Sequence, residues 1–430
     1  MQGHCKAMIQ PASARNESKV KRVLQALGPG VTTGAADDDP SGVTTYSVVG
    51  AQFGTTFLWT AWVTWPLMAA VQMMCARVGM VTGMGLAGAF RRKFPRWIVA
   101  VISTALLIAN TINIASDLSG MADAAEMLGA GPSGIYVWVF GLGICVLTVR
   151  LKYHQIANTL KWLALALFAY VITAFLVKPH WSSVLRDAAI PALPHGSAEW
   201  AALVAILGTT ISPYLFFWQA GQEVEEEKAK GRRLLIHRRG ATRRELADRR
   251  IDVGIGTFFS ILVFFFIVLT TALTLHQHGV MITTTREAAE ALRPLAGDYA
   301  YFLYTIGLVG TGLLAIPTLA GSAAYAFAET FDWAYGLDEK FRNAVSFYSV
   351  FILATVAGGA LDFFRVDPIQ ALFWSAVVNG VLAPFLLVAL LLVSNDARIM
   401  NGQVSSRLTR VVVIVTTLVM FGAAIGMFIF

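Results

Sequence analysis

Three consecutive aspartates are the residues of this chain that point most directly to chemistry. Asp37, Asp38 and Asp39 stand immediately before Pro40, inside a segment that is otherwise apolar or small. One charged carboxylate at the centre of a membrane helix costs about 2.5–3.5 kcal/mol on insertion scales, so three of them need a cation, a proton or water. Carboxylate, carbonyl and hydroxyl oxygens suit hard divalent cations such as magnesium and manganese.

A second apolar segment, 205–223, also contains a proline, Pro213, directly after Ser212. Proline removes a backbone donor and clashes with the preceding helical turn, so each proline predicts a break in its helix. This second break offers only oxygen ligands: the carbonyls near Thr209 and Thr210 and the hydroxyl of Ser212. Two ordinary proline kinks are the competing interpretation, but their matched positions and the aspartates favour an ion site.

The three aspartates cannot all face one ion, because neighbouring residues on a helix point about 100° apart. We expect Asp39, at the break itself, to be a direct metal ligand. Asp38 is a further candidate ligand, and Asp38 or Asp37 would otherwise line the vestibule or hold a proton.

Composition predicts the elements that carry these residues. Of the 430 residues 56% are hydrophobic and 14% are charged, and the mean hydropathy is +0.63. A soluble domain carries about 25% charged residues, so we predict an all-α polytopic membrane protein. Eleven apolar segments are long enough to span a bilayer: 25–52, 57–76, 97–116, 134–150, 156–177, 200–222, 252–275, 299–327, 345–364, 368–394 and 409–430.

The two breaks lie five predicted spans apart. Because five is odd, the second unit would enter the membrane from the opposite face. This arrangement is typical of two inverted repeats, here about 25–177 and 200–394 with an extra span at 409–430, in which broken helices meet near the midplane and bind the ion or substrate. We therefore predict one transmembrane domain over 25–430, preceded by a cytoplasmic tail over 1–24.

Lysine and arginine predict the orientation. They concentrate on the side of the N-terminus, and positive loops stay in the cytoplasm, so the N-terminus is predicted inside and the C-terminus outside the cytoplasmic membrane. The opposite side carries only Lys178, Arg186, Arg286, Arg293 and Arg365. The net charge of +7 is then a property of the loops and does not indicate nucleic acid. The 223–250 loop is interpreted as a solvated cytoplasmic loop that touches anionic lipid, with a regulatory or nucleic-acid-binding segment as the alternative.

The sequence resembles the natural resistance-associated macrophage protein (Nramp) family of divalent metal transporters over nearly its whole length. The resemblance rests on the predicted spans, the opening Gly28-Pro29-Gly30 and the Asp39-Pro40 pair. It implies a LeuT-like (APC-type) fold with spans 1 and 6 broken. The family's usual Asp-Pro-Gly-Asn is Asp-Pro-Ser-Gly here, so Gly42 stands where the family has an asparagine ligand.

The second family motif, usually Met-Pro-His-Asn after Ala-Thr-Val, departs as well. The resemblance implies that the metal-binding carbonyl belongs to Thr209 and that Ser212 replaces the methionine ligand; Ala36 completes the candidate ligand set. A thioether favours soft transition metals, and magnesium commonly keeps several waters. The site therefore resembles the divergent magnesium-transporting branch of the family more than its manganese and iron importers.

The resemblance also bears on proton coupling. The two histidine positions of span 6 are Tyr214 and Gln219, and the span 3 acidic pair is reduced to Asp117, with Gly120 in the second position. Asp39 and Asp117 remain as candidates for a proton path, although Asp117 could instead cap the outer end of span 3. Asn379 could reach toward the ion, or it could make a hydrogen bond between packed helices.

The predicted function is transport of a divalent metal ion, a hard or hydrated cation such as magnesium or manganese, by alternating access, and the sequence leaves open whether protons are coupled. A proton-coupled manganese or iron importer is the alternative within the class, and an amino-acid or other organic-solute symporter is a more distant one. No HExxH or GxSxG motif lies in the spans, so an enzyme is not expected. The ion is substrate, no cofactor is predicted, and a monomer in the lipid bilayer is sufficient.

Overall fold

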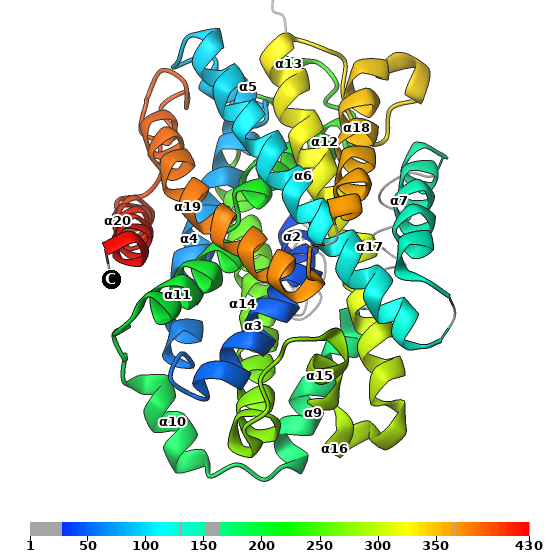
Figure 1. Cartoon of the computed structure of the whole chain (residues 1–430). Helices are drawn as coiled ribbons and strands as arrows, with labels where there is room; N and C mark the ends of the chain where they lie inside the picture. Colours follow the sequence, from blue (N-terminus) through cyan, green and yellow to red (C-terminus); the bar gives the residue numbers. More distant parts are fainter. Residues whose placement is uncertain (1–27, 130, 151–163, 365, 430) are drawn as a thin grey trace, which may run out of the picture.

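The protein is described by a computed structural model over residues 28–129, 131–150, 164–364 and 366–429. The described residues form helices and connecting loops and no strand, and the long helices run side by side as a bundle (Figure 1). The predicted tail 1–24 and the first part of the predicted span 156–177 lie outside the described residues.

Eight stretches of the described chain are long and apolar enough to cross a membrane. They are Arg96–Met127, Ser133–Arg150, Ser197–Ala229, Arg243–His278, Arg293–Phe331, Val345–Phe364, Pro368–Ser394 and Arg407–Ile429. The other three predicted spans are also helical where they are described: 25–52 as two short helices, 57–76 as α4 (Trp59–Thr82), and 156–177 as η1 (Ala164–Leu167) with α9 (Phe168–Leu176). The number eleven therefore stays a prediction.

Both predicted breaks are present. The first apolar segment is divided into α2 (Pro29–Asp37) and α3 (Pro40–Phe53), and the sixth into α11 (Ser197–Thr210) and α12 (Pro213–Ala229). Each second half begins with proline, which fits the first helical position because no intrahelical N–H is needed there. The halves pack in pairs, α2 against α12 and α3 against α11, so the two breaks lie together inside the bundle.

Three helices of 32 residues each frame the broken pair: α6 (Arg96–Met127), α14 (Arg243–Thr274) and α17 (Ala300–Phe331). At 1.5 Å per residue each is about 48 Å long, more than the hydrocarbon core of a bilayer. The prediction that span 3 ends near residue 116 is wrong, because α6 continues to Met127. Asp117 is consequently a buried residue within the helix, and its interpretation as a cap at the helix end is wrong too.

Helix α14 packs on α2 through glycine. A Cβ atom on Gly34 would lie 2.4 Å from the carbonyl oxygen of Gly256, and a Cβ atom on Gly256 would lie 2.2 Å from that of Gly30. Only residues without a side chain allow backbones to approach this closely. The first half-helix is therefore fixed directly against the backbone of α14.

The loop predicted over 223–250 is shorter than expected. Residues up to Ala229 belong to α12, and α14 begins at Arg243, where Thr242 and Glu245 form a capping box. The solvated loop is thus limited to 230–242, which includes α13 (Leu235–Arg238). The charged end of α12 and the charged start of α14 remain helical because carboxylates and guanidinium groups of this region form ion pairs with one another.

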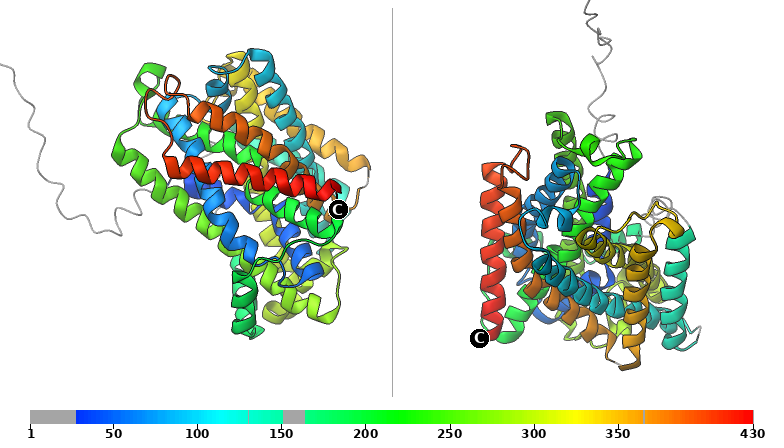
Figure 2. Two further views of the ribbon diagram at one scale, coloured as in Figure 1. Left: turned by 90° about the vertical axis from the view of Figure 1, so that its left-hand side faces the viewer. Right: turned by 90° about the horizontal axis from the view of Figure 1, so that it is seen from above.

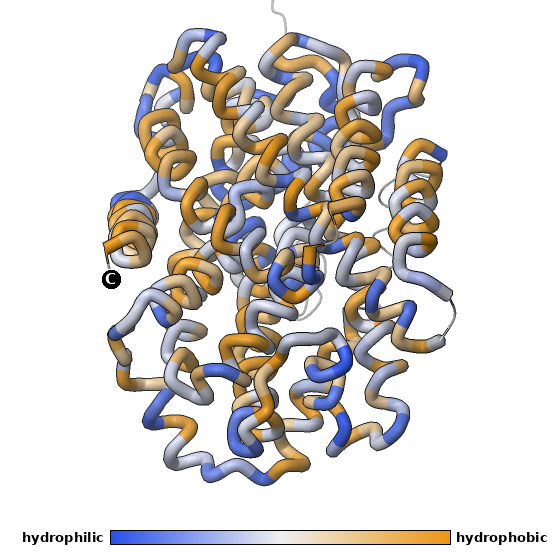
Figure 3. The backbone as a smooth tube through the Cα atoms, viewed as in Figure 1, coloured by the Kyte–Doolittle hydropathy of each residue, from blue (hydrophilic) through white to orange (hydrophobic). Residues whose placement is uncertain are grey.

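The remaining elements complete the bundle and its two ends. Helices α18 (Val345–Leu361) and α19 (Pro368–Ser394) pack on α6, and α20 (Arg407–Ile429) packs on α11 and α19 at the outside (Figure 2). Hydrophilic residues gather at both ends of the bundle and at points in its interior (Figure 3). The other helices are α5 (Leu86–Phe90), α7 (Ser133–Arg150), α10 (Trp181–Ala189), α15 (Thr285–Glu290) and α16 (Arg293–Ala296).

Candidate metal-binding site

Asp39 lies where the two broken helices meet. It caps α3, and its side chain is only 2% exposed. Its Oδ1 accepts a hydrogen bond from the amide of Gly42 at 2.6 Å, and its Oδ2 accepts one from Asn113 Nδ2 of α6 at 3.1 Å and one from the Tyr214 hydroxyl of α12 at 3.4 Å. All three donors are neutral, so the carboxylate is oriented without being neutralised.

Asn113 is the centre of the hydrogen-bond network around Asp39. Its Nδ2 also donates to Asp117 Oδ2 at 3.1 Å, and its Oδ1 accepts from Asn379 Nδ2 of α19 at 3.0 Å. Asp117 Oδ1 accepts from the amide of Ser41 at 3.2 Å. One amide side chain therefore joins the two carboxylates to a third helix.

Asn113 was not predicted as a site residue. The available signal was its position four residues before Asp117 in an apolar segment, a spacing that puts both side chains on one helix face. Asn379 makes a hydrogen bond between packed helices, to the residue that holds Asp39, and its contact with an ion stays a prediction. Its Oδ1 is buried and has no partner among the described residues, which leaves an acceptor near the site.

The other oxygens come from helix ends. Ala36 and Thr209 lie near the C-terminal ends of α2 and α11, where carbonyl groups have no helical partner and carry partial negative charge. The Ala36 carbonyl accepts from the Tyr214 hydroxyl at 2.9 Å. The Ser212 hydroxyl donates to the carbonyls of Gly208 at 2.7 Å and Thr209 at 2.8 Å, so its oxygen keeps its lone pairs for a cation.

Gly42 and Thr209 fit against each other across the two breaks. A Cβ atom on Gly42 would lie 2.9 Å from Thr209 Oγ1, 3.2 Å from Asp39 Oδ1 and 3.3 Å from the Asp37 carbonyl oxygen. An asparagine at position 42 would need the space that Thr209 fills. The glycine at position 42 and the threonine at position 209 therefore fit each other in this structure.

Asp37 and Asp38 belong to a separate group. The hydroxyl of Ser260, on α14, donates to Asp37 Oδ2 at 2.6 Å and to Asp38 Oδ1 at 3.3 Å. The expectation that the three aspartates cannot face one ion agrees with this geometry. Within the described chain no three His, Cys, Asp or Glu side chains are grouped as a metal site requires, so a bound ion would take Asp39 and neutral oxygens.

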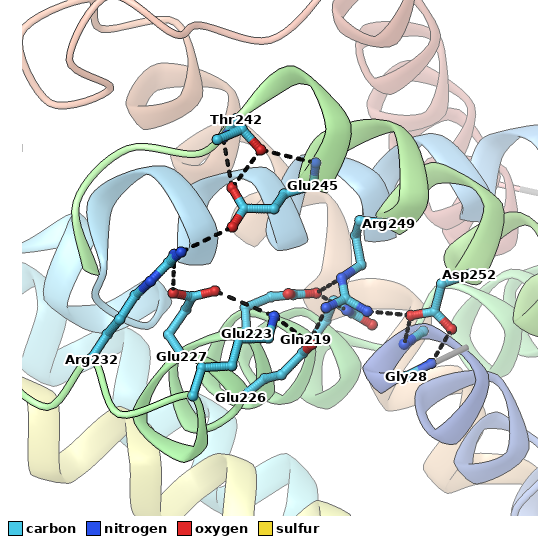
Figure 4. A network of polar contacts seen from close by, with 12 residues as sticks. Gly28, Gln219, Glu223, Glu226, Glu227, Arg232, Thr242, Glu245, Arg249 and Asp252 are labelled. Carbon is cyan, nitrogen blue, oxygen red and sulfur yellow. Dashed lines mark hydrogen bonds and ion pairs between the residues drawn. The ribbon is translucent and has the colours of Figure 1, made fainter. Parts of the chain in front are cut away.

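Gln219 lies apart from this group, in a charged network at the far end of α12. Its Nε2 donates to Glu223 Oε1 at 2.7 Å, and Glu223 pairs with Arg249 (Figure 4). The structure thus brings Asp39, Gly42 and Tyr214 together with Asp117 and Asn379, and it puts Gln219 with the charged network.

The chain belongs to the natural resistance-associated macrophage protein family: the family described as Natural resistance-associated macrophage protein-like matches residues 30–430. Among its relatives, the divalent metal cation transporter MntH of Yersinia pestis is 27% identical over 430 residues, covering 95% of this chain and 95% of that protein. The MntH of Klebsiella pneumoniae is 26% identical over 417 residues, covering 94% and 93%.

Solved structures share the fold. The Eremococcus coleocola manganese transporter, in complex with an aromatic bis-isothiourea substituted compound, aligns with a TM-score of 0.70 at 19% identity, over 95% of this chain and 87% of that one. The nucleobase-cation-symport-1 family transporter MHP1, in a closed conformation, aligns with a TM-score of 0.56 at 13% identity, over 93% and 92%. The fold is therefore that of helical membrane transporters.

Proposed function

We propose that this chain is a divalent metal cation transporter of the cytoplasmic membrane that binds its ion between the two breaks. One observation carries the proposal: Asp39 is buried at the junction of four half-helices, among neutral hydrogen-bond donors and near carbonyl and hydroxyl oxygens, with no ion pair to a described residue. A divalent cation supplies the missing charge. The names of the curated relatives support this substrate class.

The proposed ligands are Asp39, the Ser212 hydroxyl and the carbonyls of Ala36 and Thr209, with Gly42 and retained water completing the coordination. Asp38, which accepts from Ser260, would line the vestibule. An ion at this point would join α2 and α3 to α11 and α12, because each half-helix pair contributes oxygen. The Tyr214 hydroxyl donates to the Ala36 carbonyl and to Asp39. These hydrogen bonds would have to break before the two oxygens could bind the ion. Ion binding and a rearrangement of the breaks are thereby coupled.

The topology proposed for this mechanism has eleven spans, with inverted repeats over about 25–177 and 200–394 and the N-terminus inside. Alternating access then means that the broken helices open the site first to the outside and later to the cytoplasm. The fold shared with MHP1, a cation symporter by its family name, supports this architecture.

The proposed substrates are hard cations, magnesium or manganese, because Ser212 supplies oxygen where the family has a thioether. A proton-coupled manganese importer is the second candidate. One observation favours it: Asn113 links Asp39 to Asp117, so two neighbouring buried carboxylates could exchange one proton when the ion binds. Asp37, beside Ser260, is a further proton acceptor in this scheme.

Uptake into proteoliposomes tests the function. Manganese influx and internal pH would be recorded together, with magnesium as a millimolar competitor. The proposal expects saturable influx that magnesium inhibits, with no internal acidification. Manganese influx that magnesium does not inhibit and that acidifies the lumen would establish the proton-coupled manganese importer. The absence of any divalent influx would refute both candidate functions.

A further inference from the structure

Arg249 is a buried cation surrounded by acidic groups. It is 6% exposed, and its Nε lies 2.7 Å from Glu223 Oε1; its two terminal nitrogens pair with Glu226 and Asp252 (Figure 4). One guanidinium thus faces three carboxylates. Lys230 is the other cation that touches this group, 2.8 Å from Glu226 Oε1, and it is partly exposed.

Asp252 extends the network to the first half-helix. Its Oδ1 accepts from the amides of Gly28 at 2.8 Å and Val31 at 3.1 Å, and its Oδ2 accepts from the amide of Gly30 at 2.7 Å. These amides open α2, where unpaired N–H groups and the helix dipole favour a negative charge. Arg249 and Asp252 therefore hold α12 and α2 to the same turn of α14.

A polar stripe leads along α12 from the break to this network. Ser212, Gln219, Glu223 and Glu226 follow one another at spacings of seven, four and three residues, which puts them on one face of the helix. Gln219 Oε1 is buried and has no partner among the described residues, although its Nε2 is bonded to Glu223. An unused oxygen beside carboxylates is what a passing cation requires.

Building on the proposed function, we propose that Gln219, Glu223 and Glu226 form an exit site for the metal on its way to the cytoplasm, and that Arg249 closes this exit as a tethered cation. In the closed state Arg249 occupies the carboxylates and ties α12 to α2. When α12 separates from α14, Arg249 stays with Asp252, and the freed oxygens of α12 receive the ion.

A neighbouring ion-pair layer is joined to this lock only through Lys230 among the described residues, which lies 2.8 Å from Glu226 Oε1 and 3.6 Å from Glu227 Oε1. Arg232 pairs with Glu227 at 2.6 Å and with Glu245 at 3.3 Å, and it contacts none of the three carboxylates that hold Arg249. These residues connect α12 to the start of α14 at a more exposed level. The lock is therefore assigned to Arg249 alone.

Cysteine accessibility tests the closing role. A Thr33→Cys reporter, at a buried position of α2, would be built in a background without Cys5, Cys75 and Cys145 and labelled from the cytoplasmic face with a membrane-impermeant maleimide. Arg249→Gln is expected to raise the labelling rate about tenfold, because the rate follows the population of the open state. Arg249→Lys should raise it less, since the charge is retained.

Arg244→Gln is the matched control, because Arg244 lies on the same helix, is 71% exposed and pairs with Asp248; its labelling rate should equal the parent rate. An unchanged rate in a folded Arg249→Gln variant overturns the proposal. If that variant does not fold, the combined Glu223→Gln, Glu226→Gln and Arg249→Gln variant removes the guanidinium together with the two carboxylates of α12, which cores tolerate better than an unpaired charge. Asp252 keeps the amides that open α2 as its partners. The Thr33→Cys reporter must also be labelled faster in this combined variant, and a labelling rate equal to that of the parent overturns the proposal.

Transport kinetics test the exit role. With Arg249 retained, the pair Glu223→Gln and Glu226→Gln should lower the maximal uptake rate about fivefold or more while the KM changes less than about twofold, since release is slowed and entry is not. A loss confined to KM contradicts an exit site. If the parent takes up no divalent cation, the proposed function and the exit role both fail; if it does and labelling does not respond to Arg249, the lock alone fails.

Discussion

Replacing Asn113 by leucine isolates the residue that orients the proposed ligand. Leucine keeps the branching of asparagine at Cγ, with two methyl groups in place of the oxygen and the nitrogen, so the buried position stays filled, but it has no hydrogen-bonding group. The variant removes the donor shared by Asp39 Oδ2 and Asp117 Oδ2, at 3.1 Å each, and the acceptor for Asn379. The two carboxylates then face each other without an intervening N–H group.

The magnitude follows from the role of Asn113 as a partner of a ligand. Hydrogen bonds to charged groups contribute about 1.5–3 kcal/mol each to stability, but only the orientation of Asp39 enters the metal affinity. Removing such outer partners lowers metal affinity about 10–100-fold, which corresponds to about 1.4–2.8 kcal/mol. We therefore expect Asn113→Leu to raise the KM for manganese by about 10–100-fold.

The assay is initial-rate uptake into proteoliposomes over a range of manganese concentrations. Asn110→Leu is the matched control: Asn110 is buried one turn earlier on α6 and donates to the Leu319 carbonyl at 2.8 Å and the Ser322 hydroxyl at 2.9 Å, away from both carboxylates. Both variants should lose thermal stability, but the control should keep the parent KM. A KM for Asn113→Leu within about twofold of the parent, or an equal rise in both variants, would refute the reasoning.

Three further outcomes are expected. Gly42→Asn should lower uptake because the new side chain would clash with Thr209, and adding Thr209→Ala should restore part of the lost uptake. Strictly additive effects in this double-mutant cycle would contradict the contact. Ser212→Met should shift competition in uptake toward manganese over magnesium, and an unchanged preference would remove Ser212 from the ligand set. Glu329→Gln should lower the free energy of unfolding by about 1–3 kcal/mol, seen as a lower melting temperature with an unaltered KM, because Glu329 accepts from the amides of Gly85 and Gly88 at 2.8 and 3.0 Å.

Local chemistry explains which features could be predicted from the sequence. Pro40 and Pro213 each remove a donor and suit the start of a new helix, but Pro66, Pro317 and Pro384 lie inside continuous helices. Asp37 is the last residue of α2, Asp38 caps that end and Asp39 caps the start of α3, so the break itself separates Asp39 from the other two aspartates. Local chemistry therefore marks candidate breaks, and the structure shows which of the prolines divide their helices.

The features that were missed depend on contacts between residues far apart in the chain. Asn113 and Ser260 are polar residues in apolar helices, and only tertiary packing shows that they face the aspartates. The end of α6 was placed too early because Asp117 ended the apolar run, yet Asn113 and the Ser41 amide satisfy its carboxylate inside the bundle. The predicted loop 223–250 is too long because charged residues such as Arg249 indicate solvent. In the structure Arg249 lies inside α14, where buried Glu223 neutralises its charge.

Metal binding to purified protein tests the central claim most directly. Isothermal titration calorimetry with manganese and magnesium would be carried out on the parent chain and on Asp39→Asn, which keeps the shape of the side chain and removes its charge. We predict saturable binding of a divalent ion to the parent chain and the loss of this binding in Asp39→Asn. Unchanged binding in a folded Asp39→Asn variant would contradict a metal site at the meeting point of the two broken helices.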